Sequence, residues 1–213
     1  MAVADRLELV VVRHGLTAWN RERRYQGQRD IPLLLPEARP GLDRLREALA
    51  GEDFGAVHAS DLMRCRQTLA HVLVGRRDAV TPRFDARLRE LDFGEYEGKC
   101  YEELQALPAY RAWIDSVGEQ APPGGESTRA LRTRLGEWLG DLLADVEAQA
   151  LERVLIVTHG GVIRELRRHF EETDFWEGSV GQAEGRRFTF VQREGEWQCS
   201  CSSAVPAPAR ATR

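Results

Sequence analysis

The chain has 213 residues, of which 42% are hydrophobic and 30% are charged, and its formal net charge is −4. This length fits one domain or two small ones, and the composition is typical of a globular protein with a proper hydrophobic core. The charge gives no electrostatic footprint for nucleic acid, and no apolar run reaches the roughly 18–20 residues of a membrane span, so we expect neither as a partner.

The first half of the chain alternates short apolar runs with helical patterns. A strand is predicted at Leu9–Val12, because a short continuous apolar run is typical of a strand that is covered on both faces. A helix is predicted over Glu37–Ala50, and a second strand over Ala56–Ala59. Ser60 is expected to cap a helix that runs from Asp61 to about Leu73.

The middle of the chain is predicted to be mainly helical. Val80–Phe84 is interpreted as an edge strand, since Pro82 lacks the N–H that a central strand requires. One or two short helices are expected within Tyr101–Asp115. A long helix then follows from about Thr128 to Ala148, because its apolar residues keep the 3.6-residue period: Leu131, Leu135, Trp138, Leu139, Leu142 and Val146.

The last predicted elements are a strand at Val154–Val157, a helix from Val162, and a hairpin formed by Arg187–Val191 and Glu196–Cys199. Strands separated by helices favour an α/β domain with a mainly parallel sheet covered on both faces. We expect one domain over residues 1–201. Residues 202–213 are rich in Ala, Pro and Arg and are predicted to form a disordered tail.

The N-terminus and the cysteines indicate the compartment. No basic stretch followed by an apolar stretch and a cleavage site suggests secretion. The four cysteines do not make up a zinc ligand set: Cys65, Cys100, Cys199 and Cys201. We therefore expect reduced thiols and a cytoplasmic location, with Cys199 and Cys201 on one face of a strand.

Two of the predicted strands end in a histidine. Arg13 and His14 follow the first strand, and His159 and Gly160 follow the strand at Val154–Val157. In open α/β sheets the carboxyl ends of the strands border the ligand crevice, and helix N-termini there present free N–H groups to anions. Two histidines in the same context, one of them beside an arginine, therefore predict a site for an anionic ligand.

Two further residues are candidates for this site. Arg64 lies in the first turn of its predicted helix, near the same sheet edge, whereas Arg66 faces another way. Glu90 lies between Leu88 and Leu91, so it is the acid of "LRELDFGEYEG" best placed to be enclosed, and an enclosed carboxyl can serve as a general acid. Arginines, histidines and a protonatable carboxyl together suit phosphoryl transfer, in which histidine can be the nucleophile.

The sequence lacks the motifs of several other phosphoryl-transfer and hydrolytic sites. It has no P-loop, no H-E-x-x-H motif and no obvious carboxylate cluster for a metal pair. Metal-independent chemistry with no cofactor and no metal site is the simpler expectation. A metal site formed by His14 and His159 is the alternative, and it would predict zinc in the purified protein.

Four segments, "VVRHGLTAWN", "SDLMRCRQT", "LRELDFGEYEG" and "VTHGGVIREL", occur in this order and carry a resemblance. They resemble the histidine phosphatase superfamily, which has the phosphoglycerate-mutase-like fold, and look most like the smaller bacterial members of its cytosolic branch. The resemblance covers roughly Leu9 to Val191. It implies a three-layer α/β/α sandwich with a mainly parallel mixed sheet, and the homodimers that are common among relatives.

The resemblance also implies roles for individual residues. His14 would be the nucleophile that becomes phosphorylated, and Glu90 the proton donor to the leaving alcohol. Arg13, Arg64 and His159 would hold the phosphoryl oxygens. The resemblance assigns the remaining residues to phosphate and substrate binding: Asn20, Gln26, Gly27 and Gly160.

The segment after Glu90 bears on the reaction. It is the compact "ELDFGEYEGKCYEEL" of the phosphatase members, without the longer insertion of the mutases, and a shorter lid favours attack by water. We therefore expect a phosphatase that acts on a small phosphorylated metabolite. A 2,3-bisphosphoglycerate-dependent phosphoglycerate mutase and a non-catalytic binder of phosphorylated ligands are the alternatives. The substrate itself, whether α-ribazole 5′-phosphate, a sugar phosphate or a phosphoglycerate, stays open.

Overall fold

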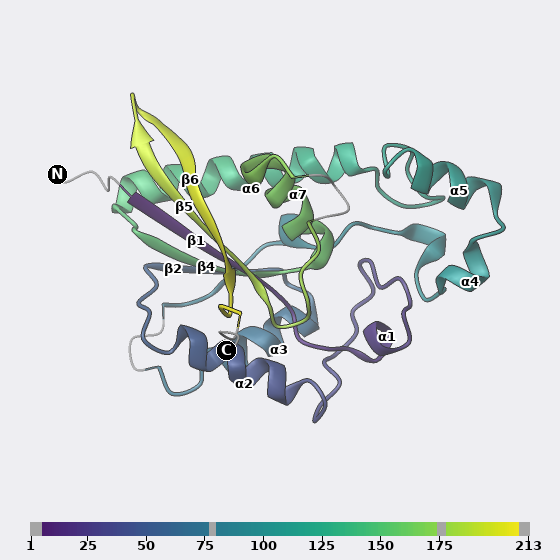
Figure 1. The fold of residues 1–213 in the computed structure, drawn as a ribbon, viewed down its shortest axis with the longest axis horizontal. Helices are drawn as coiled ribbons and strands as arrows, with labels where there is room; N and C mark the ends of the chain where they lie inside the picture. Colours follow the sequence, from purple (N-terminus) through teal and green to yellow (C-terminus); the bar gives the residue numbers. More distant parts are fainter. Residues whose placement is uncertain (1–5, 77–79, 174–177, 209–213) are drawn as a thin grey trace, which may run out of the picture.

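A computed structural model describes residues 6–76, 80–173 and 178–208 of the chain. Within these residues six strands form one mixed sheet in the order β3-β2-β4-β1-β5-β6 (Figure 1). Its four strands from β3 to β1 run parallel, and β5 and β6 are added antiparallel. The strands are β1 (Arg6–Arg13), β2 (Ala56–Ala59), β3 (Arg83–Phe84), β4 (Arg153–Thr158), β5 (Gly185–Arg193) and β6 (Glu196–Val205).

Helices cover both faces of this sheet. The α-helices are α1 (Ala18–Arg21), α2 (Arg39–Leu49), α3 (Met63–Val72), α4 (Tyr101–Leu104), α5 (Pro108–Asp115), α6 (Thr128–Gln149) and α7 (Gly160–Glu171). Helices α2 and α3 lie on one face, while α6 and α7 lie on the other (Figure 1). This arrangement confirms the expected three-layer α/β/α sandwich.

Strand β1 shows why the sequence has an unbroken apolar run at this point. Leu9 and Val11 enter the core under α6 and α7, whereas Val10 and Val12 enter the core over α2 and α3. Because successive side chains of a strand point to opposite faces, a strand buried on both sides needs apolar residues at every position. The end of β1 is thereby fixed at the middle of the sheet.

Helix α6 is the longest helix and agrees with the sequence prediction. Leu131, Leu135 and Trp138 are buried at helical spacing, and the helix ends where Ala150 adopts a left-handed φ of 51°. Its charged residues, such as Arg129, Glu137 and Asp141, lie between these positions and are exposed. Among the helices that the structure describes, none is both long and apolar enough to cross a bilayer.

Three predicted helix starts and one predicted strand need correction. Helix α2 begins at Arg39 and not at Glu37. Helix α3 begins at Met63 with Leu62 as its N-cap, so Ser60 does not cap it. Ser60 instead hydrogen-bonds to His159 with its hydroxyl. Helix α7 begins at Gly160, earlier than the predicted Val162. The edge strand after α3 is reduced to Arg83–Phe84.

The prediction that the domain ends at residue 201 is also wrong. Strand β6 continues to Val205, which pairs with Gly185 and is buried. Val205 packs into the core over α2 and α3, so residues 202–205 belong to the sheet. The sequence pattern did not indicate this part of β6, because an edge strand buries few side chains and can consist of small polar residues. Residues 209–213 of the predicted tail lie outside the described residues.

Cys199 and Cys201 lie on opposite faces of β6 and not on one face as predicted. The pairing shifts between Thr189, which faces Cys201, and Phe190, which faces Cys199. This β-bulge leaves Ser200 unpaired and changes the alternation of faces. Cys199 packs against the core under α6 and α7, whereas Cys201 is exposed, and both are free thiols.

Candidate active site

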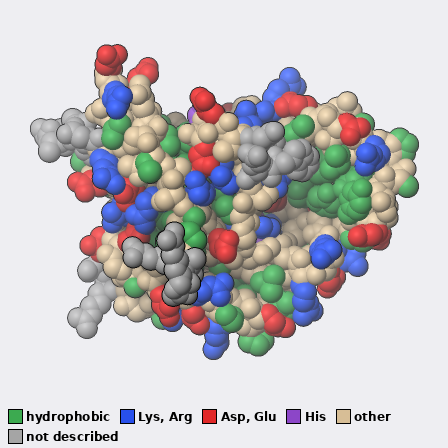
Figure 2. All heavy atoms as spheres, in the orientation of Figure 1, with side chains coloured by type: hydrophobic (Ala, Val, Ile, Leu, Met, Phe, Trp, Pro, Cys, Tyr) green, Lys and Arg blue, Asp and Glu red, His purple; other side chains and the backbone are tan. Residues whose placement is uncertain are grey.

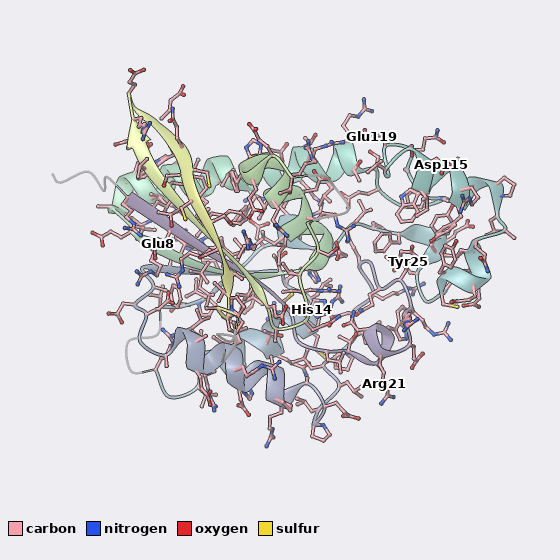
Figure 3. All side chains as sticks on the ribbon, in the orientation of Figure 1. Glu8, His14, Arg21, Tyr25, Asp115 and Glu119 are labelled. Carbon is pink, nitrogen blue, oxygen red and sulfur yellow. The ribbon has the colours of Figure 1, made fainter. Side chains whose placement is uncertain are left out.

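His14 follows the last residue of β1 and is buried at the centre of the molecule (Figure 3). Its Nδ1 atom lies 2.7 Å from the carbonyl oxygen of Gly15. Since a carbonyl oxygen can only accept, Nδ1 carries the proton and donates it. The lone pair of the neutral ring is therefore on Nε2, which is the form that a nucleophile requires.

The surroundings keep this ring uncharged. Burial lowers the pKa of His14 well below its ordinary value, and the positive charges of Arg64 and Arg13 lower it further. Burial and like charge both disfavour an imidazolium. His14 is thus a neutral base at pH 7, held beside two cations that would attract an anionic substrate.

His159 lies behind His14 at the N-terminus of α7. The two imidazole centroids are 5.2 Å apart in an edge-to-face arrangement. Nε2 of His159 lies 2.9 Å from the hydroxyl oxygen of Ser60 and 3.5 Å from the sulfur of Cys65. Burial lowers the pKa of His159 well below its usual range, and Arg64 and His14 add to this effect.

The backbone orients both arginines. Nη1 of Arg13 donates to the carbonyl of Val180 at 2.8 Å. The guanidinium of Arg64, which is fully buried, donates to the carbonyls of Arg29 and Gly27, each at 2.7 Å. Carbonyl oxygens carry only partial charge, so both cations keep most of their attraction for an anion.

Three buried nitrogens of this group have no hydrogen-bond partner within the described part of the chain: Nε of Arg13, Nε of Arg64 and Nδ1 of His159. An unsatisfied buried donor costs about 1–3 kcal/mol, so three of them in one group call for an explanation. A tetrahedral oxyanion presents several acceptors at once. The group therefore suits an anion with several acceptor oxygens beside His14.

Glu90 is buried beside the N-terminus of α7. Its Oε1 accepts from the backbone N–H of Leu91 at 3.0 Å, and both carboxylate oxygens lie 3.1 Å from the backbone nitrogen of Gly161. A Cβ atom at Gly161 would lie 2.3 Å from Oε1 of Glu90, and one at Gly160 would lie 3.2 Å from Cζ of Arg13. The two glycines thus leave room for the acid and the cation.

The remaining predicted residues surround the same cavity. Oδ1 of Asn20 accepts from the backbone N–H of Thr17, so the amide nitrogen of Asn20 is left for the cavity that it lines. Oε1 of Gln26 accepts from the hydroxyl of Thr17 at 2.9 Å. Gly27 has a φ of 51°, and a Cβ there would lie 1.8 Å from a carboxylate oxygen of Glu97, so only glycine fits.

The cavity has a volume of about 280 Å³ and two unlike halves. The polar half holds His14, Arg13, Arg64 and Glu90, with Gly160 at its edge. The other half is apolar and is lined by Tyr25, Leu91, Phe93, Trp113, Ile114 and Val117. Figure 2 shows this face of the molecule hollowed beside a group of hydrophobic side chains. The structure thus brings the predicted residues together, with His159 just behind the cavity wall.

Sequence reasoning missed the apolar half and two cations that line the cavity, Arg24 and Arg164. Tyr25 contacts Trp113 edge to face at 5.7 Å, and its hydroxyl lies 2.7 Å from that of Tyr110, which joins it to α5 (Figure 3). Helix α7 adds Arg164, which lines the cavity and whose pKa burial lowers. Arg164 lies four residues after Gly160 and hence on the same helix face, a signal that could have identified it.

A metal site formed by His14 and His159 is the alternative expectation for this region. Across the described ranges no group of three or more His, Cys, Asp or Glu side chains is placed to hold a metal ion. The absence of a metal from the chemistry stays a prediction.

Comparisons with known proteins agree with this architecture. A family model for the histidine phosphatase superfamily (branch 1) matches residues 9–202. Phosphoglycerate mutase-like protein 4 of Arabidopsis thaliana is 36% identical over 166 residues, which are 76% of this chain and 70% of that protein. The structure of YhfR from Bacillus stearothermophilus has a TM-score of 0.77 at 28% identity, covering 91% of this chain and 95% of that one. The alpha-ribazole phosphatase of Shigella flexneri has the same fold, with a TM-score of 0.77 at 24% identity over 91% of this chain and 95% of its own.

Proposed function

Because the chain belongs to the histidine phosphatase superfamily, we propose that it hydrolyses a small phosphate monoester through a phosphohistidine on His14. One observation carries the proposal. The neutral ring of His14 lines the cavity together with Arg13 and Arg64, whose buried Nε atoms have no hydrogen-bond partner among the described residues. A phosphoryl group bound there would satisfy the donors and face the nucleophile in a single geometry.

The first half of the reaction forms the phosphoenzyme. Nε2 of His14 attacks phosphorus, the P–O bond to the leaving alcohol breaks, and Glu90 gives its proton to the departing oxygen. Arg13, Arg64 and His159 stabilise the charge on the oxygens of the transferring group. Protonation by a positioned acid contributes about 10²–10⁴-fold when the leaving group is an alkoxide.

The second half returns the enzyme to its starting state. Water attacks phosphorus, the P–N bond breaks, and the carboxylate of Glu90 takes the proton that the water loses. Inorganic phosphate then leaves, and the lone pair of His14 is restored. No group beyond the substrate and water is needed for this balance.

The two halves of the cavity support hydrolysis of an ester whose alcohol has apolar surface. The alcohol would lie against Phe93, Trp113 and Ile114, which offer no partner for the carboxylate of a phosphoglycerate. A phosphoglycerate mutase is the alternative. It is favoured by the name of the Arabidopsis relative and by Arg164, a cation that also lines the cavity.

The proposal is tested with the purified protein and its His14→Ala variant, assayed with p-nitrophenyl phosphate in EDTA. We expect hydrolysis by the wild type and loss of about 10³-fold or more in the variant, because removal of the nucleophile of a covalent mechanism leaves only binding and charge effects. Rapid quenching at alkaline pH, where phosphohistidine survives, should trap a phosphoryl group on the wild type only. Full activity of His14→Ala would overturn the proposal.

The mutase alternative needs its own measurement. The protein is incubated with 3-phosphoglycerate and a 2,3-bisphosphoglycerate primer, and the release of inorganic phosphate is compared with the formation of 2-phosphoglycerate. Faster isomerisation than release would establish a mutase. We expect phosphate release from several monoesters without isomerisation, because the apolar half of the cavity favours a phosphatase.

A further inference from the structure

Arg134 of α6 lies outside the cavity, yet it is bonded to the chain segment that carries Glu90. We propose that Arg134, together with Glu126, is a positioning residue for the proton donor, which sets the efficiency of leaving-group protonation. The inference rests on the proposed role of Glu90. We refer to Arg134 and Glu126 together as the brace.

The guanidinium of Arg134 makes five hydrogen bonds. Nη1 donates to the carbonyls of Arg87 and Arg89 at 2.5 and 2.8 Å, and Nη2 donates to the carbonyl of Glu90 at 3.0 Å. Nε and Nη2 also donate to the two carboxylate oxygens of Glu126, at 2.7 and 2.8 Å. An arginine has five N–H donors in a fixed plane, so the side chain is fully used.

Glu126 contacts the main chain on the C-terminal side of Glu90, at Asp92. Its Oε2 accepts from the backbone N–H of Asp92 at 3.1 Å, and its own backbone N–H donates to the carbonyl of Asp92 at 2.9 Å. The main chain is therefore held at Arg89, at Glu90 and at Asp92. Both brace side chains are mostly buried, with 17% and 16% exposed, so their charges are paired where water is scarce.

Arg134 lies on a part of α6 that is firmly packed in the core. Arg134 is the neighbour of Leu135, and Leu131 and Trp138 lie one turn away on either side, all three fully packed in the core. A helix anchored in this way cannot shift its side chains without breaking core contacts. Arg134 thus connects the backbone of Glu90 to a helix that is packed in the core.

Glu90 is consequently held at both ends. Its carboxylate is fixed by the backbone N–H of Gly161 at the start of α7, and its carbonyl is fixed by Arg134 from α6. A displacement of about 1 Å in a reacting group can cost about 10²-fold in rate. Lysine could not replace Arg134, because three donors on one atom cannot reach acceptors spread over four residues.

Leaving-group dependence separates a positioning role from a merely structural one. A p-nitrophenolate departs well without a proton, whereas the alkoxide of an alkyl phosphate needs one. The measured quantity is kcat/KM, which reports the steps up to release of the alcohol. Hydrolysis of the phosphoenzyme is the same step for every substrate and does not contribute to kcat/KM.

The experiment compares the wild type with Arg134→Ala, Arg134→Lys, Glu126→Gln and Glu90→Gln on p-nitrophenyl phosphate and on a simple alkyl phosphate. Arg87→Ala is the matched control, because Arg87 belongs to the same segment and its side chain pairs with Asp85 and with Asp141 of α6, but not with Glu90. Circular dichroism and thermal unfolding of each variant give the folded fraction.

We expect Arg134→Ala and Arg134→Lys to lower kcat/KM for the alkyl phosphate about 10- to 100-fold. Glu126→Gln should act in the same direction to a smaller extent, and all three should leave p-nitrophenyl phosphate nearly unaffected. Arg87→Ala should lower the melting temperature without changing the ratio of the two substrates. Should Arg134→Ala fail to fold, Arg134→Lys and Glu126→Gln decide the matter.

Two failures can be told apart. If Glu90→Gln lowers both substrates equally, Glu90 is not the leaving-group acid and the proposed function is wrong at that residue. If Glu90→Gln is selective for the alkyl phosphate but the folded brace variants lower both substrates equally, or neither, the brace does not position the acid.

Discussion

The backbone N–H of Gly161 donates to both carboxylate oxygens of Glu90, at 3.1 Å each, and a Cβ on that glycine would lie 2.3 Å from Oε1. The acid and the helix therefore fit only without a side chain at this position. Gly161→Ala should displace the carboxylate and lower kcat/KM for an alkyl phosphate about 10- to 100-fold. Stability should hold, because the clashing atom is the end of a flexible side chain and alanine favours a helix.

Gly136→Ala supplies the matched control for this variant. Gly136 lies in α6, is exposed, and a Cβ there would meet nothing within 4 Å. The substitution should raise the free energy of unfolding by about 0.5–1 kcal/mol and leave activity unchanged. Equal kinetics for Gly161→Ala and Gly136→Ala would show that Glu90 tolerates a neighbour at this point and would contradict the argument.

The buried imidazoles of His14 and His159 should make stability fall in mild acid, and the buried His58, whose pKa burial also lowers, should add to the fall. Burial, then the nearby cations, lower the pKa of His14 and of His159 in the folded state. Below about pH 6.5 the unfolded chain binds protons that the folded chain does not, so the free energy of unfolding should drop by up to about 1.4 kcal/mol per pH unit for each histidine. The loss should continue until the pH reaches the folded pKa of each ring.

Urea unfolding between pH 7 and pH 5 measures this slope. His14→Gln and His159→Gln should each flatten it, because each removes one group whose protonation differs between the two states. A wild type that is equally stable at both ends of the range would mean that the imidazoles are accessible to protons in the folded protein.

Val117 combines strain with a place in the cavity. It is β-branched, has a φ of 54° in the left-handed region, and lines the apolar half. Val117→Asn should relieve about 1 kcal/mol of backbone strain and raise the melting temperature. It should also raise KM for aromatic phosphates roughly fivefold, through loss of about 1 kcal/mol of apolar contact. Glycerol phosphate, which has little apolar surface, serves as the comparison, and an equal change for both substrates would argue against an apolar leaving group.

Glu8 should matter for stability and not for catalysis. It lies on β1 at the end away from His14 (Figure 3), and accepts from Arg153 at 2.7 Å and from Arg187 at 2.8 Å. Burial alone would raise the pKa of Glu8, but the hydrogen bonds from Arg153 and Arg6 outweigh it and keep the pKa below its usual value.

Glu8→Gln should therefore lower the free energy of unfolding by about 1–3 kcal/mol at pH 7, since charge-assisted bonds are lost. The difference from the wild type should shrink as the pH falls through the range in which Glu8 itself takes up a proton. Urea titrations at pH 7 and pH 4 give both numbers. A fall in kcat/KM of the folded variant would show that the two ends of β1 are coupled.

The sequence predicted the fold and the polar half of the site because both depend on local patterns. The apolar run of β1 and the histidine after it are neighbours in the chain, and the parallel arrangement then brings His159 to His14. The prediction that Ser60 caps a helix is wrong. A serine before a helical pattern caps the helix only where its hydroxyl is not hydrogen-bonded to a residue that is distant in the sequence. The hydroxyl of Ser60 is hydrogen-bonded to His159, 99 residues along the chain.

The missed residues share a physical reason. Tyr25, Phe93 and Trp113 come from a loop, a 3₁₀ turn boundary and a short helix, and no period in the sequence aligns them. Their contact arises from tertiary packing of aromatic rings, which a single sequence does not display. The strand β6 was cut short for a related reason, since an edge strand of small polar residues carries little hydrophobic signal.

His14, the proposed nucleophile, and the apolar wall of the cavity are built on different parts of the molecule. His14 follows a central strand, and its backbone N–H donates to the carbonyl of Thr158 at 2.9 Å, so it is anchored on the neighbouring strand as well. The apolar wall comes from the loop of Tyr25, the segment of Leu91 and Phe93, and the end of α5, and none of these belongs to a strand of the sheet. Helix α5 lies well away from the sheet (Figure 1). Under the proposed mechanism, substitutions in this wall would change the alcohol that fits the cavity and leave the residues around His14 unchanged, so that substrate choice and bond breaking form separate modules.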